Sequence, residues 1–119
     1  MEIKGDSIRW ADASLEKIET TYDKVALHLC EDSGQRKLLH GLGHIGFQMI
    51  GFWDEMIIEK AAVSSDHPFI AECERRVERL PATGTNARRP TGNRLLEVTF
   101  IDGCRLWVCA HRFHCTSAS

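Results

Sequence analysis

The sequence predicts an α+β domain, in which a mainly antiparallel β-sheet of about five to seven strands carries one amphipathic helix on its face. The first observation is alternation, because apolar side chains occupy every second position in runs such as 25–30, as they do in β-strands. The second is a change of period over 66–80, where apolar residues follow the 3.6-residue repeat of an α-helix. The third is turn chemistry between the runs, of which Asp102-Gly103 is the clearest case.

Length and composition indicate an ordinary globular protein. The 119 residues fit a single domain over 1–119, and the chain is 43% hydrophobic and 27% charged. A charged start without an apolar run predicts no signal peptide, and no stretch is apolar enough for a membrane span, so we expect a cytoplasmic protein. An odd number of cysteines, five, argues for free thiols in a reducing compartment.

Residues 7–63 are predicted to form a β-meander. Turn residues at 31–34 separate two of its strands, and β-branched residues favour a further strand over 56–63. Residues 12–22 fit two structures, because Leu15 and Ile18 have helical spacing while the following Thr20-Thr21-Tyr22 prefers an extended backbone. We favour a strand, with a β-bulge that brings Leu15 and Ile18 to one face.

The second half of the chain is predicted as helix, loop and hairpin. Ser64, Asp66 and Pro68 form a helix start, and the helix over 66–80 ends before Pro81. The stripe that it would bury contains Phe69, Ile70, Cys73, Val77 and Leu80.

A polar loop over 81–94 then leads to a C-terminal β-hairpin over 95–115. With Asp102-Gly103 as a type I′ turn, Val98 lies opposite Trp107. In that register Trp107 and Cys109 face the core.

Three short patterns stand out along the chain, namely Asp12-Ala13-x-Leu15-x-x-Ile18, Phe52-Trp53-Asp54-Glu55-x-Ile57-Ile58, and Gly103 leading into Val108-Cys109. Together they resemble small bacterial domains of the immunity-protein type, some of which neutralise toxins delivered between competing bacteria. The resemblance implies a small β-rich fold and offers no catalytic motif. Its immunity-type members imply a protein that binds another protein.

Several motifs bear on chemistry, and each has an ordinary structural explanation. Residues 41–46 match the G-x-G-x-x-G of dinucleotide sites, but no helix pattern follows, which favours a glycine-rich turn. His28 and Cys30 share a strand face, although nothing in the sequence activates the thiol.

A cysteine and histidine group at 109–115 has no familiar zinc spacing, and whether it binds metal is left open. Its members are Cys109, His111, His114 and Cys115. We expect no catalytic residue, metal or cofactor.

The leading interpretation is a non-enzymatic accessory domain that neutralises a protein partner by occlusion. Its binding surface would combine an aromatic anchor with acidic side chains, namely Trp53, Asp54, Glu55 and Glu59.

A basic loop is a candidate anion-binding site, with Arg88, Arg89 and Arg94 as its residues. The net charge of −2 makes nucleic acid an improbable partner, and we expect no membrane partner.

Two alternatives remain. One is a small-molecule-binding protein or small enzyme with a pocket between sheet and helix, near His40 and His44. The other is an accessory domain that self-associates into a homodimer through an open sheet edge.

Overall fold

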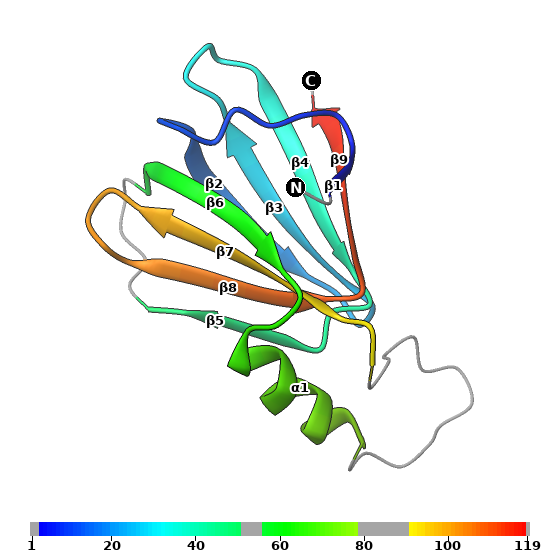
Figure 1. The fold of residues 1–119 in the computed structure, drawn as a ribbon. Helices are drawn as coiled ribbons and strands as arrows, with labels where there is room; N and C mark the ends of the chain where they lie inside the picture. Colours follow the sequence, from blue (N-terminus) through cyan, green and yellow to red (C-terminus); the bar gives the residue numbers. More distant parts are fainter. Residues whose placement is uncertain (1–2, 51–55, 79–90, 119) are drawn as a thin grey trace.

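The structure is a computed structural model that describes residues 3–50, 56–78 and 91–118 (Figure 1). Within these ranges the chain forms nine β-strands in two sheets and a single α-helix of 11 residues. All strand pairings except one are antiparallel. The predicted α+β class is therefore confirmed in outline. The prediction of one sheet with five to seven strands is wrong.

The strands divide into two sheets: the chain forms four strands of sheet A, then all four strands of sheet B, and returns to sheet A with its last strand. Sheet A has the order β1 (Ile3–Gly5), β9 (Arg112–Ala118), β4 (Arg36–Leu42), β3 (Lys24–Cys30) and β2 (Ser14–Thr20). Sheet B has the order β5 (Gly46–Met49), β8 (Arg105–Ala110), β7 (Arg94–Phe100) and β6 (Ile58–Ser64). Strands β2, β3 and β4 form a meander as predicted, but β5 and β6 lie at opposite edges of the other sheet.

The core lies between the two sheets, because each contributes the apolar row of its strands. Leu27, Leu39 and Phe113 of sheet A pack with Val98 and Leu106 of sheet B, and each of these side chains is at most 2% exposed. Removing such side chains from water is the main force that holds the sheets together.

Strand β2 resolves the ambiguity over 12–22 in favour of the strand. Leu15 pairs with Leu29 and Ile18 pairs with Leu27, so the register shifts by one residue between them. That shift is the predicted bulge, and both side chains contact the core as a result.

Helix α1 (Pro68–Glu78) packs on the outer face of sheet B and forms a third layer (Figure 1). Ile70 and Cys73 are buried against Leu95 and Cys109 of the sheet. The backbone N–H of Phe69 donates to Nδ1 of His67 at 3.1 Å, so His67 caps a helix that begins at Pro68, two residues after the predicted start. The last two residues of the predicted helix over 66–80 lie outside the described ranges.

The β7–β8 hairpin differs from the predicted one in its turn. Gly103 has φ +91° and its N–H donates to the Phe100 carbonyl at 2.9 Å, which is a type I turn closed by a G1 bulge. The register therefore moves by one residue, and Trp107 pairs with Glu97. Because a one-residue shift reverses the faces of a strand, Trp107 faces the helix and the predicted core position is wrong.

The predicted strand that returns from this turn is also divided. Strand β8 ends at Ala110, and after His111 the chain crosses to sheet A as β9. The hairpin predicted over 95–115 therefore spans both sheets.

Candidate functional site

The outer face of sheet A carries a row of basic and imidazole side chains. Helix α1 covers sheet B on the opposite side of the molecule, and no described helix or strand lies over the outer face of sheet A (Figure 1). We name this surface the sheet A face. Its cations are Lys4, Lys17, Lys24, Arg36 and Arg112, and its imidazoles are His28, His40 and His114.

Strand alternation places these side chains on one surface, because their neighbours along each strand point into the core. Lys4 lies opposite His114, His114 lies opposite His40, and His40 lies opposite Ala26. A second row runs parallel to the first through Arg112, Leu42 and Lys24. Antiparallel cross-strand neighbours of this kind are about 4.5–5.5 Å apart at Cβ, so the side chains of each row lie next to one another on one surface.

The carboxylates on this face balance only part of its positive charge. Oε1 of Glu19 lies 2.5 Å from Nε2 of His28 and 3.5 Å from Nζ of Lys17. The hydrogen bond with His28, and then the charge of Lys17, hold the pKa of Glu19 below its usual value.

Glu16 lies 3.7 Å from Arg36 in a second ion pair. By contrast, Lys4, Lys24 and Arg112 form no ion pair with any described residue. Positive charge is therefore in excess over the half of the face formed by β1, β9 and the ends of β3 and β4.

His40 occupies the middle of the face and is partly enclosed by its neighbours. Its Nδ1 is buried without a hydrogen-bond partner among the described residues. Burial, followed by the nearby charges of Lys24, His114 and His28, lowers the pKa of His40. The central imidazole is therefore held neutral more strongly than an imidazole in water.

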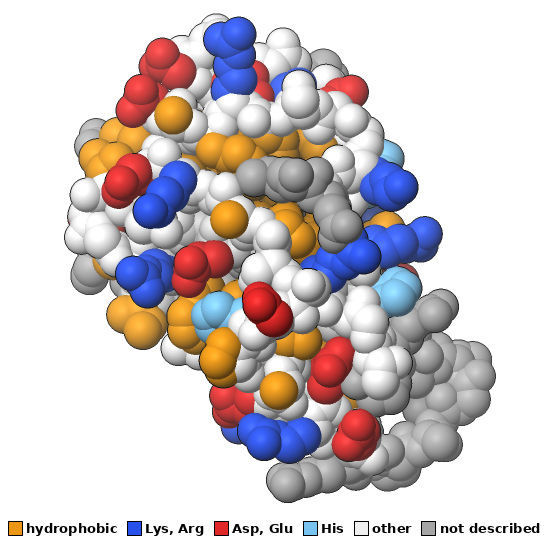
Figure 2. Space-filling model, in the orientation of Figure 1, with side chains coloured by type: hydrophobic (Ala, Val, Ile, Leu, Met, Phe, Trp, Pro, Cys, Tyr) orange, Lys and Arg blue, Asp and Glu red, His pale blue; other side chains and the backbone are white. Residues whose placement is uncertain are grey.

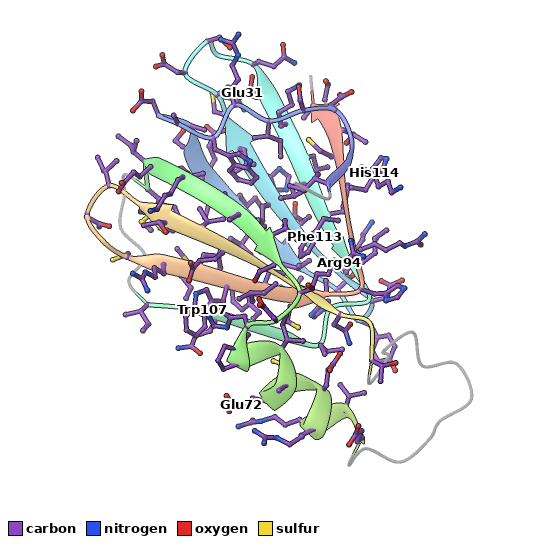
Figure 3. All side chains as sticks on the ribbon, in the orientation of Figure 1. Glu31, Glu72, Arg94, Trp107, Phe113 and His114 are labelled. Carbon is purple, nitrogen blue, oxygen red and sulfur yellow. The ribbon has the colours of Figure 1, made fainter. Side chains whose placement is uncertain are left out.

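A cleft of about 520 Å³ opens at the edge of the sheet A face, where β1 and β9 meet the start of β7. Its lining includes Ile3, Lys4, Arg94, His111, Arg112 and Phe113. Basic and imidazole side chains gather along this side of the molecule in Figure 2, and Figure 3 shows Arg94 and His114 on the same side. The lining has no carboxylate among the described residues, so the cleft is cationic.

His111 occupies the single-residue joint between β8 and β9. Its backbone N–H donates to the Leu42 carbonyl at 3.0 Å, which fixes the joint against the end of β4. Its Nδ1 is buried and makes no hydrogen bond within the described part of the chain. Such a group costs free energy unless something pairs with it.

The residues predicted as binding sites are only partly described. Trp53, Asp54, Glu55, Arg88 and Arg89 lie outside the described residues. Glu59 is exposed on β6 of sheet B, away from the sheet A face, and Arg94 begins β7 and lines the cleft.

The cysteine and histidine group at 109–115 does not come together. Cys109 lies under helix α1, Cys115 lies in the core between the sheets, and His114 lies on the sheet A face. The described ranges hold no cluster of three or more metal-ligating side chains.

The glycines at 41–46 serve packing and a turn. Gly43 has φ +65° between β4 and β5, and a Cβ on Gly46 would overlap Sγ of Cys73. A strand, β5, follows them, whereas the dinucleotide motif needs a helix.

Side chains fill the contact between α1 and sheet B, where a small-molecule pocket was an alternative. Cys73 and Leu95 are buried there, whereas His40 lies on the sheet A face. His44 lies in the turn before β5, with Nε2 2.9 Å from the Thr21 carbonyl.

No protein-family model matches this sequence, and no curated protein or solved structure matches it significantly. No helix in the described ranges is both long and apolar enough to cross a membrane. Function has to be inferred from the geometry of the sheet A face and its cleft.

Proposed function

We propose that this protein is a non-enzymatic binding domain whose sheet A face covers an acidic surface of a partner protein. The observation that carries the proposal is a sheet face that no described helix or strand covers, on which Lys4, Lys24 and Arg112 form no ion pair with described residues. A partner with carboxylates opposite them would supply the missing charge.

The shape and rigidity of the face support protein binding. Its side chains project from strands of a continuous sheet, so no backbone segment of the face has to be ordered when a partner binds. Leu38 and Leu42 lie between the charged groups and are half-buried, which adds apolar contact to the charge pairs. A broad sheet surface of this kind suits occlusion of another protein.

The proposal keeps the mechanism expected from the sequence and reverses the sign of its charges. The predicted acidic surface was to cover a basic site, whereas the described face is basic and requires an acidic partner. An immunity-type role, in which that partner is a toxin, is the most specific form of the proposal and rests on the resemblance alone.

Affinity capture with matched charge reversals tests the proposal. The face variant is Lys24→Glu with Arg112→Glu, and the control variant is Lys60→Glu with Arg75→Glu, two exposed residues on β6 and α1. Both variants change the net charge equally. We expect an acidic protein to be retained by the wild type and the control from an extract of the native cells and lost by the face variant. Equal retention of the same partner by the face variant would reject the proposal.

A further inference from the structure

We infer that the cationic cleft between β1, β9 and β7 binds the oxyanion of a small organic acid, a carboxylate or a phosphate ester, that also carries an apolar group. The cleft shares Lys4 and Arg112 with the protein-binding face, but the inference goes beyond the proposed function because it concerns a small ligand and is tested without a protein partner.

The charges of the cleft point to an anion. Lys4 and Arg112 project from neighbouring strands of sheet A, and Arg94 comes from sheet B on the other side. Lys4 and Arg112, which form no ion pair with described residues, repel each other across these neighbouring strands, and a bound anion relieves that repulsion. An arginine can also hold both oxygens of a carboxylate or phosphate at once.

His111 adds a polar group that the fold leaves unsatisfied. His111 lines the cleft, and its Nδ1 atom is buried and has no described hydrogen-bond partner. In the tautomer that carries its hydrogen on Nδ1, the imidazole would donate a hydrogen bond to an oxyanion and would recover the cost of its burial.

The apolar floor of the cleft favours a ligand that has an apolar group as well as an oxyanion. Ile3 and Phe113, paired across β1 and β9, supply an apolar base next to the charged rim. A volume of about 520 Å³ exceeds what an inorganic phosphate needs and lies in the range of small-molecule sites. The best ligand therefore combines an oxyanion with a compact apolar group.

Backbone chemical-shift titrations with four probes test the inference. Benzoate and phenyl phosphate have both the oxyanion and the apolar ring, inorganic phosphate lacks the ring, and benzamide lacks the charge. We expect saturable shifts of residues at the cleft with benzoate or phenyl phosphate, and weaker binding of the other two. Whichever of the first two binds more tightly identifies the carboxylate or the phosphate ester as the natural head group.

Substitutions at the exposed rim complete the test. Arg112→Gln should weaken binding of the better probe about tenfold, since a charge-assisted hydrogen bond is lost. Lys4→Gln provides a second variant if Arg112→Gln disturbs the fold, and Lys17→Gln at the far side of the face should change nothing. Equal affinity for benzoate and benzamide, or unchanged binding in both Arg112→Gln and Lys4→Gln, would overturn the inference. Because no protein partner is present, either result leaves the proposed function to be judged separately.

Discussion

Nε1 of Trp107 donates a hydrogen bond of 2.6 Å to Oε2 of Glu97, across the β7–β8 hairpin and beneath helix α1. The indole also contacts two rings at the start of the helix, with centroid distances of 4.8 Å to His67 and 5.3 Å to Phe69. Because the Glu97 carboxylate holds the indole in place, this pair links the sheet to its covering helix.

Substitution of Glu97 tests that link. Glu97→Ala leaves the half-buried indole N–H without its acceptor and should reduce the free energy of unfolding by about 1–2 kcal/mol. Glu97→Gln keeps an amide oxygen as acceptor and should reduce the free energy of unfolding by less than Glu97→Ala does. Urea unfolding followed by tryptophan fluorescence measures both, and two variants as stable as the wild type would show that the bond contributes little.

The same pair shows why the sequence predicted the elements better than their faces. Alternation and the helical stripe identified most strands and the helix, because burial imposes those periods on the residues themselves. The face of Trp107 depended on whether the turn at Asp102-Gly103 had two or three residues, a difference of one in register. The pairing of strands into two sheets depends on contacts between distant segments, which no local pattern contains.

Gly46 should tolerate no side chain while Cys73 lies above it. A Cβ at Gly46 would overlap Sγ of Cys73, so Gly46→Ala should force α1 away from sheet B and cost about 1–3 kcal/mol. In a Cys73→Ala background the same change should cost less, because the sulfur is gone. Denaturant unfolding of the single and double variants gives the coupling free energy between Gly46 and Cys73. Strictly additive effects would show that the two sites do not meet.

His40 should make stability depend on pH. Its pKa lies below the ordinary imidazole value of 6.5, so in the range just below 6.5 the unfolded chain binds more protons than the native protein. The free energy of unfolding should therefore fall as the pH drops from 6.5 through the folded pKa of His40. Urea titrations across this range should show a shallower dependence for His40→Gln, and an identical slope in the variant would refute the assignment.

The five free thiols should differ in reactivity. Burial raises the pKa of Cys109 to about 12 and also raises that of Cys73 and Cys115, so these thiols are both enclosed and protonated. Alkylation near neutral pH, followed by mass spectrometry, should modify the half-buried Cys30 and Cys104 first. Modification of Cys109 as fast as Cys30 in the native protein would contradict this packing.

The candidate site was the least predictable part of the protein. The alternating positions of β3, β4 and β9 each contain histidine and cationic residues, as in Lys24 and His28 or His40 and His114. That signal is visible only once β4 is known to lie between β3 and β9. Arg94 was identified from composition, but its neighbours in the cleft come from the first and last strands of the chain.

The most direct test of the sheet A face as an acidic-protein binding surface is a backbone chemical-shift titration with a glutamate-rich peptide. We expect the largest changes at residues of β3, β4 and β9, weakening with added salt and absent in the Lys24→Glu, Arg112→Glu variant. Changes centred on α1 or β6, or tighter binding of duplex DNA at the same face, would contradict the account.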